Sequence, residues 1–200
     1  MVSEIKIEEV FSQNWPIIDV RSPGEFDSGH IPKAINIPLF SNDERAQVGT
    51  IYKKQSKEAA IKKGYELVEP NLGEFLIKSH KAAPNGNVIV HCWRGGMRSQ
   101  SFAKHLSDNG FTDAKVIIGG YKAFRNFVLD SLTSPFHLKV IGGYTGSGKT
   151  HILFELKKQG NQIIDLEGLA NHKGSAFGGI GMGNQPTVEQ FENNLYAELN

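Results

Sequence analysis

The segment Cys-Trp-Arg-Gly-Gly-Met-Arg-Ser, residues 92–99, is the first part of the chain whose residue types suit chemistry. It follows an apolar run and precedes a segment with helical periodicity, so Cys92 is expected at the carboxyl end of a parallel strand, where α/β folds bind ligands. Backbone N–H groups of a tight loop and the positive end of the next helix stabilise a thiolate and an oxyanion held beside it. The two glycines permit the curled backbone, and Arg98 adds a planar set of donors for an anion. A reactive thiolate is therefore predicted, and a buried structural cysteine is the alternative.

Residues 143–150, Gly-Tyr-Thr-Gly-Ser-Gly-Lys-Thr, form a second candidate site because they match the phosphate-loop pattern G-x-x-x-x-G-K-[ST]. In such a loop, backbone N–H groups converge on phosphate oxygens, the lysine adds a positive charge, and the last hydroxyl reaches a divalent ion such as Mg²⁺. Asp165 is either the acidic partner of a metal-bound phosphate or the cap of the next helix. The predicted phosphate-binding residues are Gly143, Gly146, Ser147, Gly148, Lys149 and Thr150.

The elements that must position these two loops alternate along the chain, which predicts an α/β fold with a mostly parallel sheet. Short apolar runs predict strands at 16–20, 34–37, 88–92, 114–118, 137–141 and 162–165. Helical spacing predicts helices at 44–63, 71–81, 98–109, 121–130, 149–159 and 187–200. Turn-forming residues at 131–135 predict two domains, 1–135 and 136–200. About 65 residues are too few to bury a full phosphate-loop core, so the second domain is expected to be the N-terminal part of a larger one.

The amino-acid composition excludes several classes of protein. Hydrophobic residues make up 39% and charged residues 22% of the 200, which is typical of a globular chain. The sequence contains neither a long apolar run nor a basic-then-apolar start, so we expect a cytoplasmic protein without a membrane segment. The single cysteine excludes internal disulfides, and the net charge of +1 excludes a strongly polybasic protein. A local cluster of lysines at 53, 54, 57, 62 and 63 indicates either an RNA-binding face or a solvated helix surface.

Two further segments carry a family resemblance. Residues 18–38 resemble the first signature of the rhodanese family, and residues 117–124 resemble the second, so that the likeness covers about 10–128. The resemblance implies an α/β domain with Cys92 as a persulfide-forming residue. Asp19 and Arg21 of the first signature are also candidates for an ion pair that holds the loop.

The loop departs from the usual rhodanese pattern in one respect. Five residues separate Cys92 from Arg98, whereas most sulfurtransferase loops have four, and the longer spacing is that of cysteine phosphatases. A wider ring of N–H groups can hold a tetrahedral oxyanion, so a rhodanese-fold cysteine phosphatase or an arsenate reductase is an alternative function. Residues 93–97 offer no acidic side chain to protonate a leaving alcohol, which weakens the phosphatase interpretation.

A rhodanese-like domain followed by the start of a P-loop NTPase-like α/β domain is similar to one family, the bacterial tRNA 2-selenouridine synthases. Residues 42–53, 165–178 and 185–186 add to this resemblance. It implies a transferase that replaces sulfur by selenium in the wobble 2-thiouridine of tRNA. Selenophosphate would be the selenium donor and geranyl diphosphate the co-substrate that first alkylates the sulfur, with no tightly bound cofactor.

Carried onto this chain, the resemblance makes Cys92 the nucleophile that handles selenium or sulfur. Arg94 and Arg98 become its anion partners, and the loop from Gly143 to Thr150 becomes the cradle of a phosphorylated ligand. Two other functions stay open from the residues alone: a sulfurtransferase module attached to a P-loop domain, and a rhodanese-like module that regulates a P-loop partner without catalysis.

Overall fold

The computed structural model describes residues 2–144, 146–174 and 177–200. The chain divides into two compact units, residues 1–127 and 128–200. Each unit is described by itself below. Thr145, one of the positions of the phosphate-loop pattern, lies outside the described residues.

The first unit is built on a parallel sheet, as predicted. Its strands are β1 (Ser3–Ile5), β2 (Ile17–Asp19), β3 (Ile35–Asn36), β4 (Asn87–His91) and β5 (Asp113–Ile117), in the order β1-β5-β4-β2-β3. The register places Asp19 of β2 beside His91 of β4. Four of the strands correspond to predicted runs. β1 was not predicted, because a three-residue edge strand with two exposed polar residues has too little apolar pattern to recognise.

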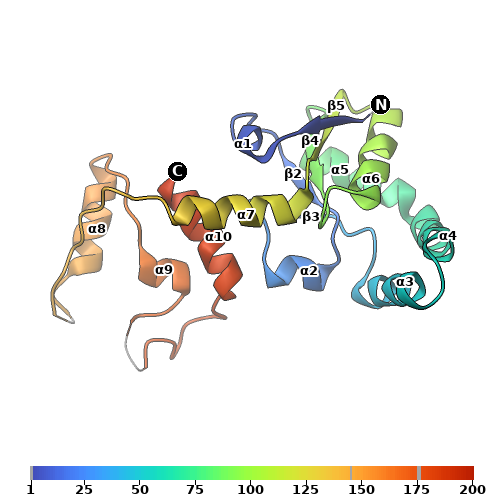
Figure 1. Cartoon of the computed structure of the whole chain (residues 1–200). Coiled ribbons are helices and arrows are strands. Elements are labelled where there is room, and N and C mark those ends of the chain that lie inside the picture. The colour runs from blue at the N-terminus through green and yellow to red at the C-terminus, as the bar shows by residue number, and fades with distance from the viewer. Residues whose placement is uncertain (1, 145, 175–176) are drawn as a thin grey trace. The chain divides into compact units, whose positions relative to one another are not determined.

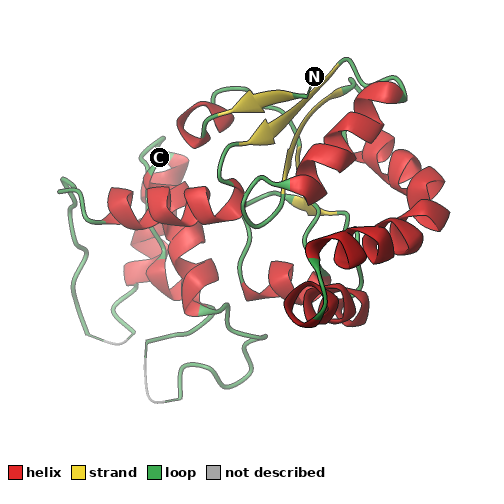
Figure 2. Ribbon diagram, turned by 45° about the vertical axis from the view of Figure 1, so that its right-hand side comes forward, coloured by secondary structure: helices red, strands yellow, loops and turns green. Residues whose placement is uncertain are grey.

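Helices surround this sheet (Figure 2). They are α1 (Ile7–Val10), α2 (Pro23–Ser28), α3 (Asn42–Lys54), α4 (Lys57–Val68), α5 (Leu72–Ala82), α6 (Met97–Asp108) and α7 (Gly120–Leu132), with a 3-10 turn at Glu69–Asn71. α5 and α6 lie on one side of the strands and α1 on the other (Figures 1 and 2). Because side chains alternate along a strand, Val88 and Val90 pack with Phe75 and Phe102 of the first side.

The single helix predicted at 44–63 is wrong, since two helices, α3 and α4, occupy this stretch. The break is at Gln55 and Ser56. The Ser56 hydroxyl accepts the N–H of Ala59 at 3.0 Å and so caps α4. A serine side chain that satisfies a free backbone N–H favours a new helix start over continuation of the old helix.

The second unit contains α8 (Lys149–Lys158), α9 (Leu166–Ala170) and α10 (Val188–Leu199), which confirms the helices predicted at 149–159 and 187–200. The strands predicted at 137–141 and 162–165 are wrong, because neither run is a strand in the part of the chain that is described. A strand needs a neighbour to accept its ladder of hydrogen bonds, and none of the described strands lies beside these two runs. Leu138 and Val140 are instead 60% and 90% exposed.

The division of the two units falls at 127/128, within α7. The domain limit predicted at 135/136 stays a prediction. No helix among the described residues is long and apolar enough to cross a membrane.

Candidate active site

Cys92 follows β4 directly, at the carboxyl end of the parallel sheet. Its side chain is buried and shares the side of the sheet occupied by Val88 and Val90, whereas His91 points to the opposite side. The segment 93–96 then forms the loop that leads into α6. The strand-end position predicted for the cysteine is confirmed.

The backbone of this loop is held by the start of α7. The N–H of Tyr121 donates to the carbonyl of Cys92 at 2.9 Å, and the N–H of Lys122 donates to the carbonyl of Trp93 at 3.0 Å. In a trans peptide the N–H points away from the preceding carbonyl, so the N–H groups of Trp93 and Arg94 face away from α7. The loop therefore presents donors on its other side, where the sulfur lies.

Two glycines allow the loop and α7 to approach this closely. Gly95 and Gly120 have positive φ angles of 66° and 58°. A side chain at position 120 would overlap the carbonyl of Cys92 and the nitrogen of Gly95. These two glycines are required by both conformation and space.

The surroundings of Cys92 favour its thiolate. Burial opposes ionisation and is the largest effect, but the Ser99 hydroxyl, the positive charge of Arg98 and the N–H groups of Ser99 and Arg94 outweigh it, and the pKa of Cys92 is lowered. The Ser99 oxygen lies 3.3 Å from the sulfur. The same hydroxyl is 3.1 Å from the carbonyl of Gly96, so its single proton can turn to the sulfur when the thiolate forms.

Arg98, predicted to bind an anion, already holds a carboxylate. Its Nη1 donates to Oε2 of Glu25 at 2.9 Å, and Arg45 approaches the same oxygen at 3.5 Å. Burial raises the pKa of Glu25. The hydrogen bond and charge of Arg98, the N–H of Ser22 and the charge of Arg45 together outweigh this effect, so the pKa is lowered overall. Arg94 is exposed. The arginine beside the cysteine is thus oriented by α2, while Arg94 is open to solvent.

A buried ion pair supports the loop from the opposite side of the sheet. Arg21 binds both carboxylate oxygens of Asp19, with its closest approach at 2.6 Å, and donates to the carbonyl of Gly29. Its guanidinium carbon lies 3.8 Å from the centre of the Tyr121 ring and 5.9 Å from that of Trp93. The predicted scaffold pair is therefore confirmed, and it packs beneath the residues that follow Cys92.

The contacts of Asp19 and His91 determine the direction in which the pKa of each is shifted. Burial raises the pKa of Asp19, but the charge that His91 carries when protonated, together with the hydrogen bonds and charge of Arg21, outweighs this effect and the pKa is lowered. Burial also lowers the pKa of His91, which favours the neutral imidazole. The lowered pKa favours the Asp19 carboxylate, which is the form that Arg21 binds.

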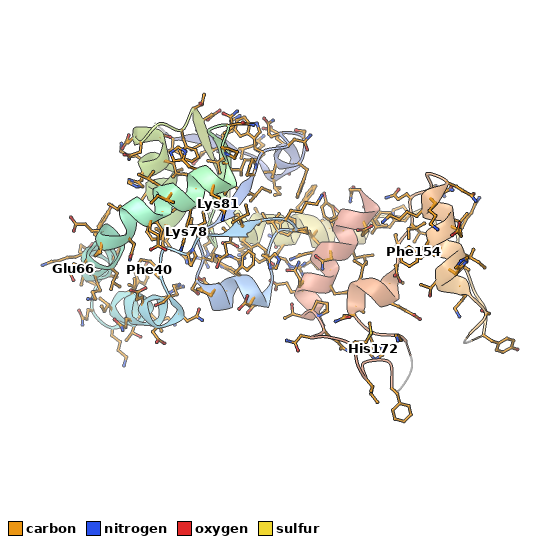
Figure 3. All side chains as sticks on the ribbon, turned by 180° about the vertical axis from the view of Figure 1, so that it is seen from behind. Phe40, Glu66, Lys78, Lys81, Phe154 and His172 are labelled. Atoms are coloured by element: carbon orange, nitrogen blue, oxygen red, sulfur yellow. The ribbon has the colours of Figure 1, made fainter. Side chains whose placement is uncertain are left out.

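A pocket of about 1100 Å³ opens in front of the cysteine, between the loop, α6 and the helices α3 and α4. Cys92, Arg94 and Arg98 all line it, so the three residues predicted to act together lie at one site. Phe40, labelled in Figure 3, is part of its wall, and its ring approaches Gly64 of α4. The sequence does not predict this pocket, because its pattern indicates one continuous helix where α3 and α4 form the wall.

The predicted phosphate loop lies in the second unit. Gly143, Gly146 and Gly148 have positive φ angles, which glycine adopts without strain. Lys149 is the first residue of α8, and its Nζ donates to the carbonyls of Gly143 and Tyr144, both at 3.0 Å. Ser147 and Thr150 are exposed. These features suit a phosphate site, and the assignment stays a prediction.

Of the two interpretations of Asp165, the structure shows the cap. Its carboxylate accepts the N–H of Gly168 at 3.0 Å at the start of α9. Among the described residues, no cluster of three or more histidine, cysteine or acidic side chains is placed to hold a metal ion. The lysine cluster falls on α3 and α4, where all but the half-buried Lys63 are exposed.

Comparison with known proteins accounts for most of the chain. Residues 6–127 match the family model of the rhodanese-like domain. The chain belongs to this family. Residues 136–200 match a second model, described as the tRNA 2-selenouridine synthase AAA domain. A rhodanese-like domain is thus followed by the start of a nucleotide-binding-type domain, which confirms the predicted α/β fold class.

The chain is similar over nearly its whole length to proteins named tRNA 2-selenouridine synthase. It is 42% identical to those of Bdellovibrio bacteriovorus and Nitrosomonas europaea, over 97% and 95% of its own length and 52% and 50% of theirs. The chain therefore spans about half the length of the curated relatives it matches. A solved structure, the N-terminal domain of a Clostridium difficile 630 protein, is 46% identical with a TM-score of 0.60, over 64% of this chain and 99% of that one. The resemblance predicted from the motifs is confirmed.

Two residues of the rhodanese-like site were missed from the sequence. Glu25 binds the arginine of the loop, and Ser99 contacts the sulfur. Glu25 carries a recognisable signal, since Ser22 and Glu25 have the spacing of a capping box, which forms at α2. Nothing in that spacing indicates that the carboxylate also reaches α6, seventy-three positions along the chain.

Proposed function

We propose that the protein to which this chain belongs replaces sulfur by selenium in the wobble 2-thiouridine of tRNA, through a geranylated intermediate. Geranyl diphosphate first alkylates the sulfur at C2 of the base, and diphosphate leaves. The Cys92 thiolate then bonds to C2 as the C2–S bond breaks and geranylthiol departs with a proton from water, and selenium from selenophosphate displaces Cys92 from C2. Water takes the phosphoryl group, so that phosphate and 2-selenouridine are the other products.

The observation that carries this proposal is a buried cysteine with a lowered pKa that lines a large pocket, in a chain that resembles 2-selenouridine synthases over 97% of its own length. Cys92 is the nucleophile that handles the chalcogen in the exchange. The N–H groups of the loop, with Arg94 and Arg98, bind the phosphate of the donor.

The alkylation step is assigned to the phosphate loop. Gly143, Gly146 and Gly148 leave backbone N–H groups free to approach a diphosphate, and Lys149 adds positive charge. Thr150 supplies a hydroxyl for Mg²⁺ on that diphosphate. Sulfur on C2 of a pyrimidine is a poor leaving group, and its alkylation makes departure as a thiol feasible.

Nucleoside mass spectrometry of tRNA tests this division of labour in the full-length protein. Lys149→Ala should abolish the geranylated nucleoside, whereas Cys92→Ser should let it accumulate without selenouridine. Lys158→Ala, on the same helix α8 and paired with Glu155 at the surface, is the matched control and should behave like the parent.

Two results would contradict the proposal. Loss of the geranylated nucleoside in both site variants would refute the division between the loops. Normal selenouridine in Cys92→Ser would exclude the cysteine from the reaction.

The five-residue spacing between Cys92 and Arg98 also favours a second candidate, a cysteine phosphatase or arsenate reductase. Turnover of p-nitrophenyl phosphate or reduction of arsenate that disappears in Cys92→Ser would support that function. An unreactive Cys92 together with intact ligand binding at the phosphate loop would instead favour a noncatalytic module.

A further inference from the structure

The pocket beside Cys92 is much larger than a selenophosphate or phosphate ion requires. Its volume of about 1100 Å³ is slightly above the range for sites that enclose drug-sized ligands, roughly 300–1000 Å³. In the function proposed above, the tetrahedral anion occupies only the loop formed by residues 92–98. The space in front of the loop is therefore available to another part of the substrate.

The walls of this space are mainly hydrocarbon. Val48 of α3, Ile61 and Val68 of α4, Leu72 of α5 and Phe102 of α6 line it together with Phe40. Ile61 is half-buried, and Phe40 and Phe102 are buried. An apolar ligand that displaces water from such walls gains free energy in proportion to the area covered.

Charge is arranged around this apolar space in a way that suits a nucleic-acid substrate. Cationic residues lining the pocket outnumber the acidic ones, Glu69 and Asp108. The cationic residues are Arg45, Lys53, Lys57, Arg94, Arg98 and Lys104. Lys104 is paired with Asp108, and Arg45 and Arg98 are paired with Glu25, so the remaining positive charge is that of Lys53, Lys57 and Arg94. The pocket thus combines an apolar interior, a nucleophilic sulfur and a positive border.

We infer that the pocket between α3, α4 and α6 is the subsite for a branched hydrocarbon chain carried on the sulfur of the substrate nucleoside. This inference rests on the function proposed above, in which that chain is geranyl. The apolar walls receive the chain, the positive border meets the phosphates that flank the nucleoside, and the alkylated carbon–sulfur bond lies between them, beside Cys92.

This assignment gives the helices α3 and α4 a specific function. α3 and α4 supply Val48 and Ile61 to the walls, and Lys53 and Lys57 to the border. An unalkylated 2-thiouridine carries no hydrocarbon chain to place against those walls. The pocket therefore selects the alkylated nucleoside over the unalkylated one for the exchange step.

Isothermal titration with two nucleosides tests the subsite on the 200-residue chain. S-geranyl-2-thiouridine should bind about a hundredfold more tightly than S-methyl-2-thiouridine, since the two differ only in the hydrocarbon group on the sulfur. Ile61→Lys places a charge in the apolar wall and should remove most of this difference. The matched control is Ile77→Lys on α5, because Ile77 is 72% exposed and does not line the pocket.

A second variant, Ile61→Trp, fills the pocket without adding charge and should also weaken binding of the geranyl compound selectively. Thermal unfolding of each variant establishes that it is folded. Equal affinity of the parent for the two nucleosides would overturn the inference, as would a preference for geranyl that both Ile61 variants retain. Sedimentation that reveals self-association of the chain, lost in Ile61→Lys, would assign the pocket to a second copy and overturn it as well.

These outcomes are separable from those of the proposed function. Selenouridine formation by the full-length protein, without preferential binding of the geranyl nucleoside here, would overturn the subsite and leave the function standing. Preferential binding that depends on Ile61, in a full-length protein that forms no selenouridine, would support the subsite and refute the function.

Discussion

Replacing Ser99 with alanine should slow the alkylation of Cys92 about tenfold at pH values below its inflection. The Ser99 hydroxyl lies 3.3 Å from the sulfur, and both residues are buried. A hydrogen bond to a charged group contributes about 1.5–3 kcal/mol. The lower value applies here, because the N–H groups of Ser99 and Arg94 remain in the variant. About 1.4 kcal/mol changes the thiolate fraction tenfold.

The assay is the rate of reaction with iodoacetamide as a function of pH. The parent should show an inflection below that of a free thiol, and Ser99→Ala should shift it to higher pH. Ser107→Ala is the control, because Ser107 lies on the same helix and its hydroxyl only bonds the carbonyl of Ala103. A profile for Ser99→Ala that superimposes on that of the parent would refute the role of this hydroxyl.

Three further predictions concern the charges around the two loops. Glu25→Gln removes the carboxylate that neutralises Arg98, so the thiol should react with iodoacetamide a few times faster, and an unchanged rate would contradict this coupling. Asp19→Asn leaves the charge of Arg21 buried without a partner and should lower the free energy of unfolding in urea by about 3–5 kcal/mol. Because folding lowers the pKa of Asp19, the ionised carboxylate stabilises the fold above the ordinary carboxyl pKa, and this stabilisation is lost as pH falls through the lowered pKa. Asp19→Asn should therefore lose less stability in acid than the parent does. The same pH dependence of unfolding in the variant and the parent would contradict this role of Asp19. Lys149→Ala should weaken binding of geranyl diphosphate in a calorimetric titration and leave the alkylation rate of the thiol unchanged.

Local sequence pattern was sufficient for the elements that carry the cysteine. The strand before Cys92 and the helix after it are strongly patterned, and a glycine-rich link between two such elements has few possible arrangements. The same logic failed at 137–141 and 162–165. Their apolar runs have strand periodicity, but strand formation depends on a neighbour that local pattern does not specify.

The candidate site was predicted as a short stretch of chain, whereas its chemistry depends on distant residues. Glu25 comes from α2, the carbonyl contacts come from α7, and the pocket wall comes from α3 and α4. Each of these contacts depends on tertiary packing. Arg98 was correctly placed beside Cys92, yet its bond to Glu25 required the register of two separate helices.

The two hydrogen bonds from α7 to the carbonyls of Cys92 and Trp93 have a consequence for how this domain can diversify. Because both donors and both acceptors belong to the main chain, substitution of side chains leaves this anchorage intact. The side chains at 93, 94, 97 and 98 can then vary in size and charge while the donors of the loop keep their direction. Relatives with the same anchorage can accept different leaving groups on an unchanged frame, provided that positions 95 and 120 remain glycine.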